Sequence, residues 1–82
     1  MTHTKDERYV IALYRMAQEA GDVEQAFNRY VVGDKAGLQP KGVNAICKLL
    51  VQANFIKKRG EEEVYLTPHG EKLALRLLDE IQ

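Results

Sequence analysis

The sequence predicts one mainly helical domain that carries a single small β-hairpin. Its 82 residues are the length of one small domain. Apolar residues recur at helical spacing in the stretches 5–20, 40–53 and 68–81, whereas the stretch 57–66 has the pattern of two short strands around Gly60. We therefore expect residues 1–82 to form a single domain in the order helix, helix, helix, turn, helix, hairpin, helix.

The first helix is expected from Lys5 to Ala20. Thr4 and Glu7 have the spacing of a capping box, and Gly21 follows as a helix terminator. More than half of the helix circumference is apolar, through Tyr9, Val10, Ile11, Leu13, Tyr14, Met16, Ala17 and Ala20. Because one small domain covers limited surface, we expect part of this face, with part of the last helix, to contact a second copy. The alternative is that neighbouring helices of the same chain pack on its edges.

A second helix is expected to begin at Asp22, because Asp22 and Gln25 have the spacing of a capping box. Its buried side would comprise Ala26, Phe27, Tyr30 and Val31. The β-branched pair at 31–32 favours a short extended piece. Residues 33–36 would then form a short third helix ahead of the turn.

The central prediction is a tight turn followed by a longer helix, from Gly37 to about Ala53. Gly37 suits the left-handed conformation that ends a helix, and Pro40 has the fixed φ that suits a first helical turn. One face of the longer helix is apolar, with Val43, Ile46, Cys47, Leu50 and Ala53. The opposite face carries amines and amides without a carboxylate, from Lys41, Asn44, Ala45, Lys48 and Gln52. Such a face can present hydrogen-bond donors to the major groove of DNA, and its asparagine can pair with adenine.

The stretch 57–66 predicts a β-hairpin with Gly60 at its tip. A tight turn at 60–61 would place opposite charges across the two strands. The resulting pairs would be Arg59 with Glu62 and Lys58 with Glu63.

The last helix is expected from Pro68 to about Ile81. Asn54 can end the preceding long helix in the left-handed conformation, and Thr67 is a favourable cap directly before Pro68. The apolar face of the last helix would hold Leu73, Ala74, Leu77, Leu78 and Ile81, with Leu75 outside it.

Charge is unevenly distributed, although the net charge is zero. Six basic residues and no acidic residue lie between Lys35 and Arg59, whereas the remaining segments hold six basic and twelve acidic residues. This local excess of positive charge would attract a polyanion. The alternative is a solvated face on a balanced protein.

The order of elements resembles the winged helix-turn-helix domains of bacterial and archaeal transcription regulators. The resemblance covers nearly the whole chain and rests on AGLQPKGV at 36–43, LLVQANFI at 49–56 and LTPHG at 66–70. In that family the helix after the turn usually enters the major groove, and the hairpin, or wing, contacts the backbone or minor groove. The resemblance therefore places near DNA the residues Gln39, Lys41, Asn44, Ala45 and Lys48 of the helix and Lys57, Lys58 and Arg59 of the wing. The acidic run 61–63 departs from this pattern and would weaken the attraction of the wing for phosphate.

These observations predict a non-enzymatic, homodimeric transcription regulator that binds double-stranded DNA. The alternative is a winged-helix module for protein–protein contact, which the net neutrality and the acidic run favour. An RNA-binding variant is a third interpretation. Duplex binding by the helix face distinguishes the first interpretation from the second.

Other chemistry is not expected. His3 and His69 lack a Cys or carboxylate partner at metal-ligand spacing, so we expect neither a metal nor another cofactor. Cys47 lies on an apolar face without an activating base, which predicts a small core residue. A single cysteine and a polar N-terminus without a signal-peptide pattern predict a cytoplasmic protein. No apolar run is long enough for a membrane span.

Overall fold

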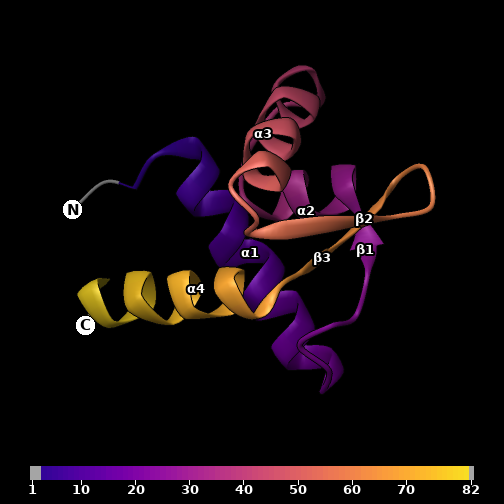
Figure 1. Cartoon of the computed structure of the whole chain (residues 1–82). Coiled ribbons are helices and arrows are strands. Elements are labelled where there is room, and N and C mark those ends of the chain that lie inside the picture. Colours follow the sequence, from indigo (N-terminus) through magenta and orange to yellow (C-terminus); the bar gives the residue numbers. More distant parts are fainter. Residues whose placement is uncertain (1–2, 82) are drawn as a thin grey trace.

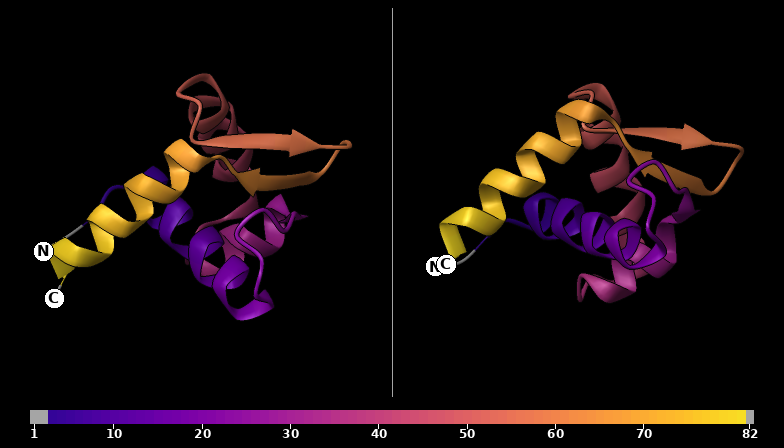
Figure 2. Two further views of the ribbon diagram at one scale, coloured as in Figure 1. Left: turned by 60° about the horizontal axis from the view of Figure 1, so that its bottom comes forward. Right: turned by 90° about the horizontal axis from the view of Figure 1, so that it is seen from below.

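The computed structural model describes the backbone of residues 3–81 and the side chains of residues 3–79. Within that range the elements are α1 (Lys5–Ala20), β1 (Phe27–Asn28), α2 (Arg29–Lys35), α3 (Pro40–Gln52), β2 (Ile56–Arg59), β3 (Glu63–Leu66) and α4 (Pro68–Ile81). The β2–β3 hairpin projects from the helices on the side opposite to the start of α1 and the end of α4 (Figure 1, Figure 2). The hairpin is therefore far from both the start of α1 and the end of α4.

Helix α1 lies at the centre of the fold and contacts α2, α3, α4 and β3. Its residues Tyr9, Val10 and Leu13 are fully buried in the main apolar cluster. Helix α4 packs against α1 and buries Ala74 and Leu77. Since a fully buried large apolar side chain contributes about 1.5–3 kcal/mol, α1 supplies much of the stability of this small core.

The small sheet is antiparallel, with strand order β1-β3-β2. Phe27 of β1 pairs with Val64 of β3, and Ile56 of β2 pairs with Leu66. Ile56, Val64 and Leu66 lie on one face because side chains alternate along a strand, and all three are buried in the core. The hairpin is thereby fixed to the helical body at its base.

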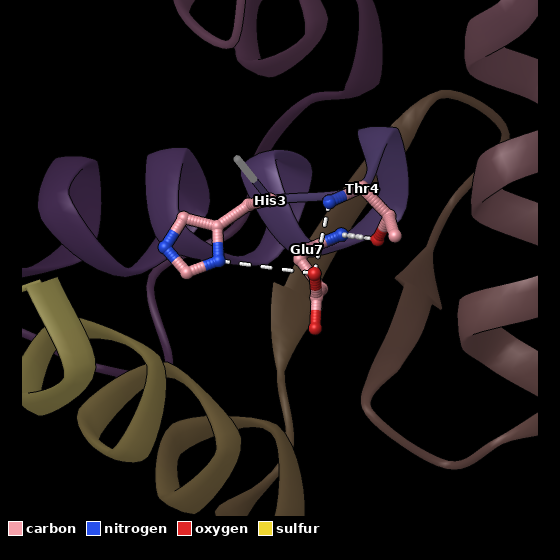
Figure 3. Close-up of polar contacts among 3 residues, drawn as sticks. All are labelled: His3, Thr4 and Glu7. Carbon is pink, nitrogen blue, oxygen red and sulfur yellow. Dashed lines mark hydrogen bonds and ion pairs between the residues drawn. The ribbon is translucent and has the colours of Figure 1, made fainter. Parts of the chain in front are cut away.

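The start of α1 is the capping box that the sequence predicts (Figure 3). The N–H of Glu7 donates to the Thr4 hydroxyl oxygen at 3.2 Å, and the N–H of Thr4 donates to the Glu7 carboxylate at 2.8 Å. His3 Nδ1 lies 3.8 Å from the same carboxylate, so His3 has a carboxylate neighbour four residues along the chain, contrary to the expectation from the sequence. The helix ends where Gly21 adopts the left-handed conformation, with φ of 76°. The predicted bounds Lys5 and Ala20 are confirmed.

The end of α3 also follows the prediction, with one difference. Asn54 is left-handed, with φ of 66°, and the N–H of Phe55 donates to the carbonyl oxygen of Leu50 at 2.9 Å. Helix α3 ends at Gln52, so Ala53 is its cap and is exposed rather than part of the apolar face. Exposure of Ala53 follows from the change of chain direction at Asn54.

Helix α4 begins as predicted. The Thr67 hydroxyl oxygen accepts a hydrogen bond from the N–H of Gly70 at 3.0 Å, and the same hydroxyl donates to the carbonyl oxygen of Asn54 at 2.6 Å. Ala74 and Leu77 are buried, and the other described members of the predicted apolar face, Leu73 and Leu78, are half-buried. The side chain of Ile81 lies outside the described residues.

The predicted helix at Asp22 is wrong. The Asp22 carboxylate accepts a hydrogen bond from the N–H of Glu24 at 2.9 Å, and its carbonyl accepts one from Gln25 at 3.1 Å, but this forms an isolated turn. The segment then becomes extended because Phe27 pairs with the distant β3. Helix α2 begins only at Arg29, and its cap is Asn28.

The predicted extended piece at 31–32 and the separate helix at 33–36 are also wrong, since these residues lie within or at the end of α2. Val31, expected to be buried, is 48% exposed, and Tyr30 is half-buried. Val32 and Gly33 face the core instead. The described residues therefore form four helices rather than five.

The apolar surface of α1 is covered mostly by the chain itself. Tyr9 and Ile11 are buried and Met16 is half-buried, whereas Ala20 is exposed. The expected surplus of apolar surface on α1 is therefore largely absent, because α2, α3, α4 and β3 pack around this helix. Among residues 3–81, no helix is both long and apolar enough to cross a membrane.

Candidate nucleic-acid interface

Helices α2 and α3 form a tightly packed helix-turn-helix. Gly37 is left-handed, with φ of 75°, and its N–H donates to the carbonyl oxygen of Asp34 at 3.0 Å. The N–H of Leu38 donates to the carbonyl oxygen of Gly33 at 2.8 Å. A Cβ at position 33 would overlap a methyl group of Val43, so the close approach of the two helices requires glycine there. The turn and this contact together fix the position of α3.

Helix α3 buries one side and leaves the other in solvent, as the sequence predicts. Val43, Ile46, Cys47 and Leu50 are buried. We call the exposed side the α3 outward face; with the preceding cap it comprises Gln39, Lys41, Asn44, Ala45, Lys48 and Gln52, all exposed. It carries amines and amides but no carboxylate. This surface can donate hydrogen bonds to acceptors on base edges or phosphates.

One residue of the outward face is held by a neighbouring helix. The hydroxyl of Tyr30 in α2 donates to Oδ1 of Asn44 at 3.3 Å. Tyr30 is itself fixed by its N–H, which donates to the side chain of Asn28 at 2.9 Å. The sequence predicts Tyr30 only as a core residue, since a tyrosine at helical spacing reveals nothing about a partner for its hydroxyl.

The wing loop is longer than predicted, and the cross-strand pairs differ from the predicted ones. Arg59 pairs with Glu63, and Lys58 pairs with Val64, because residues 60–62 form the loop. The predicted pairs of Arg59 with Glu62 and of Lys58 with Glu63 are therefore wrong. Gly60 is left-handed, with φ of 67°, which is the conformation expected of a glycine in such a loop. Within the described part of the chain, no ion pair joins the wing cations to the wing acids.

The wing cations point to both sides of the hairpin. Lys57, Lys58 and Arg59 are exposed. Strand alternation places Lys58 on the same face as the buried Ile56, and Lys57 and Arg59 on the other face. The Arg59 guanidinium lies 5.8 Å from the ring centroid of Tyr65, which provides a cation–π contact. The three cations therefore do not form one continuous cluster.

The wing loop is attached to the start of α2 through Arg29. The backbone N–H of Arg29 donates to the carbonyl oxygen of Glu62 at 2.9 Å, and its guanidinium donates to the carbonyl oxygen of Glu61. The guanidinium also lies 5.6 Å from the ring centroid of Tyr30. Arg29 thus connects the loop of the wing to α2, whose Tyr30 donates a hydrogen bond to Asn44.

Two further cations lie beside the start of α3. A hollow of about 470 Å³ is lined by Lys5 and Arg8 of α1 together with Gln39 and Lys41, and no acidic residue lines it. The sequence does not group Lys5 and Arg8 with the basic segment, because they precede it by about thirty residues. Their three-residue spacing on a helix could have indicated a shared face, but not its proximity to α3.

Cys47 and Tyr9 form a buried polar pair beneath the outward face. Burial raises the pKa of the Tyr9 phenol, and the hydrogen bond from Cys47 raises it further. Burial also raises the pKa of the Cys47 thiol, and the hydrogen bond to Tyr9 partly offsets this. Both side chains are therefore neutral near pH 7, which agrees with the predicted core role of Cys47. No group of three or more His, Cys, Asp or Glu side chains suited to a metal ion occurs among the described residues.

The helix-turn-helix, the hairpin after it and the flanking helices define a winged helix-turn-helix fold. The chain is similar to the crystal structure of ligand-free NadR, with a TM-score of 0.66 and 21% identity over 93% of this chain. It is similar also to NMB1585, a MarR family regulator from Neisseria meningitidis, with a TM-score of 0.64 and 25% identity over 92% of this chain.

These comparisons confirm the predicted fold class, mainly α with a small β-hairpin, which the structure extends to a three-stranded sheet. The chain spans about half of each solved structure, 53% and 54% respectively. No protein-family model and no curated protein matches the chain. The chain therefore shares the winged-helix fold of these two solved structures, one of which is a MarR family regulator.

Proposed function

We propose that this winged-helix domain binds double-stranded DNA through the α3 outward face and acts in transcription regulation without enzymatic activity. The observation that carries the proposal is the exposure of every polar side chain on that face, in a segment without acidic residues between Lys35 and Arg59. Exposed donors on a helix held by a helix-turn-helix match the chemistry of the major groove. We further propose that residues 1–82 act as one unit in the cytoplasm.

The proposed contacts divide into two kinds. Lys41 and Lys48 would neutralise phosphates or donate to guanine, and Ala45 can contact a thymine methyl group. Gln39 precedes the helix and would donate to the backbone or a base edge. The wing cations Lys57, Lys58 and Arg59, and the additional α1 cations Lys5 and Arg8, would contact phosphates. Because so much of the interface is cationic, binding should weaken strongly with salt.

We propose that the protein is a homodimer through its first and last helices. The support is the part of α1 that the chain leaves uncovered, a hollow of about 650 Å³ whose lining combines Ile11, Ala12 and Met16 with charged side chains, and the 49% exposure of Leu75 on α4. A twofold dimer can place two α3 helices about one DNA turn apart. Light scattering at micromolar concentration should then give about twice the 9.3 kDa mass of one chain, and a species of 9.3 kDa alone would contradict the dimer.

The test of DNA binding is a titration into random-sequence duplex, followed by fluorescence anisotropy at about 50 mM and about 200 mM salt. We expect binding at the lower salt concentration and weaker binding at the higher one. The double variant Lys41→Glu with Lys48→Glu should abolish binding at both. The matched control is Lys72→Glu with Arg76→Glu, which reverses two exposed charges on α4. Absence of binding at either salt by the folded protein would contradict the proposal and favour a protein–protein module.

A further inference from the structure

We propose that Tyr30 is a positioning residue that fixes Asn44 with its amide N–H groups directed to the ligand, so that Asn44 reads a hydrogen-bond acceptor on a base edge. This inference rests on the proposed DNA binding. Its basis is the hydrogen bond from the Tyr30 hydroxyl to Oδ1 of Asn44, at 3.3 Å. Asn44 lies on the exposed side of α3, where a side chain without such a partner would be free to rotate.

Tyr30 is well held for this role. Its side chain is half-buried against the main core cluster, and its N–H is fixed by Asn28 at 2.9 Å. The Arg29 guanidinium lies 5.6 Å from the centroid of its ring. Because a tyrosine side chain has only two rotatable bonds before the hydroxyl, these contacts leave the position of the hydroxyl nearly fixed.

The direction of the hydrogen bond decides which base Asn44 can recognise. With Oδ1 accepting from Tyr30, the two N–H groups of Nδ2 remain for the ligand. A bidentate pair with adenine needs Oδ1 for the N6 amino group and Nδ2 for N7, so Oδ1 would have to accept from Tyr30 and from adenine at once, using both of its lone pairs. Guanine presents N7 and O6 as acceptors and needs no acceptor from the protein. Guanine is therefore favoured over adenine at the position that Asn44 contacts, because it leaves Oδ1 to Tyr30 alone.

The geometric part can be tested without DNA. Side-chain amide resonances of uniformly ¹⁵N-labelled protein report the order of the Asn44 amide, and Asn44→Ala assigns them. We expect Tyr30→Phe to lower the order parameter of Asn44 Nδ2 while the backbone spectrum remains that of the folded protein. The matched control is Tyr65→Phe, which removes the hydroxyl of another half-buried tyrosine. An Asn44 amide with the same order in wild type and Tyr30→Phe would overturn the inference.

The reading part is tested by selection from a random duplex library with wild type, Asn44→Ala, Tyr30→Phe and Tyr65→Phe. Asn44→Ala identifies the base position, where wild type should enrich guanine. Tyr30→Phe should reduce the ratio of guanine to adenine there by roughly three- to tenfold, the value of one hydrogen bond. Tyr65→Phe should leave the ratio unchanged.

The outcomes separate the inference from the function on which it rests. Enrichment of adenine or cytosine by wild type at the position that Asn44 reads would overturn the inference, and so would a ratio that Tyr30→Phe does not change. Failure of wild type to enrich any duplex would overturn the proposed DNA binding and with it the reading role of Asn44. In that last case the amide measurement still decides whether Tyr30 holds Asn44.

Discussion

The thiol of Cys47 donates a hydrogen bond to the hydroxyl oxygen of Tyr9, with 3.2 Å between Sγ and Oη. The same Tyr9 hydroxyl donates to the carbonyl oxygen of Arg29 at 2.9 Å. One buried hydroxyl group therefore connects α1 with both helices of the helix-turn-helix. These two hydrogen bonds lie beneath the α3 outward face, so we expect them to help hold α3 in place.

The first prediction concerns that hydroxyl. Tyr9→Phe keeps the ring in the core but removes both hydrogen bonds, so we expect the free energy of unfolding to fall by about 1–2 kcal/mol. Urea denaturation followed by circular dichroism measures the change. The control Tyr65→Phe removes a hydroxyl from a half-buried position and should change stability by less than about 0.5 kcal/mol. Equal stability of Tyr9→Phe and wild type would show that the two hydrogen bonds of the Tyr9 hydroxyl contribute nothing to the free energy of unfolding.

The second prediction concerns alkaline pH. Burial raises the pKa of the folded Cys47 thiol, whereas an unfolded thiol has a pKa of about 8.5. Between the pKa of the unfolded thiol and the higher pKa of the folded thiol, only the unfolded state has lost its proton. The contribution of the thiol to stability is therefore complete below about pH 8 and decreases as the pH rises. From about pH 7.5 to about pH 9.5 we expect a loss of about 1 kcal/mol, measured by urea denaturation.

Cys47→Ala separates this effect from others. The variant should be less stable at both pH values, because it leaves a small cavity and removes the hydrogen bond that the Tyr9 hydroxyl oxygen accepts. Its stability should nevertheless decrease less between the two pH values than that of wild type. An equal decrease in the two proteins would show that the thiol does not cause the alkaline loss.

The third prediction compares two glycines in helices. A Cβ at Gly70 would overlap the carbonyl oxygen of Phe55, whereas a Cβ at Gly42 would meet no atom within 4 Å. Gly70→Ala should therefore destabilise the protein by about 2–3 kcal/mol through a forced shift of the backbone. Gly42→Ala should stabilise it by about 0.5–1 kcal/mol, because alanine favours the helix. Thermal unfolding distinguishes these opposite signs, and destabilisation by both would contradict the open space at position 42.

The fourth prediction concerns the α1 cations beside the start of α3. If Lys5 and Arg8 contact phosphates, Lys5→Ala with Arg8→Ala should reduce the slope of log affinity against log salt by about 2. Titration of random duplex at several salt concentrations measures the slope. Lys72→Ala with Arg76→Ala on α4 is the matched control and should leave it unchanged. An unchanged slope in the α1 variant would restrict the proposed interface to α3 and the wing.

The fifth prediction concerns the acids of the wing loop. Glu61 and Glu62 are exposed and not paired with the wing cations, so they should repel phosphate. Glu61→Gln with Glu62→Gln keeps the carbonyl groups that Arg29 holds and should raise affinity for duplex roughly two- to fivefold at low salt. Glu19→Gln with Asp79→Asn, on α1 and α4, is the control. No gain in the wing variant would mean that this loop does not approach the DNA.

The sequence predicts the elements with strong local determinants. Helix α1 has both a capping box and a terminal glycine, and α3 and α4 each combine an initial proline with a clear apolar period. Residues 22–36 are different, because their conformation depends on the pairing of Phe27 with Val64, far along the chain. Local capping chemistry at Asp22 is real but yields only a turn. A short β-bridge therefore overrides a plausible helix.

The candidate site divides in the same way. Helical periodicity correctly predicts which side of α3 is exposed, because its core side is continuous. It cannot predict that Tyr30 reaches Asn44, or that Lys5 and Arg8 line the same hollow as Lys41, since both depend on how separate elements pack. The predicted wing register is wrong because one additional loop residue changes every cross-strand partner.

The attachment of the wing loop to Arg29 has a consequence for any redesign of this domain. The wing loop is held by two of its carbonyl groups, which accept hydrogen bonds from the side chain and the backbone N–H of Arg29. A hairpin extended by insertion would keep its buried base, but its loop would lose this attachment unless carbonyl groups still met position 29. The length at which the hairpin loop can stay attached is thus limited by Arg29, the first residue of α2, which lies outside the hairpin.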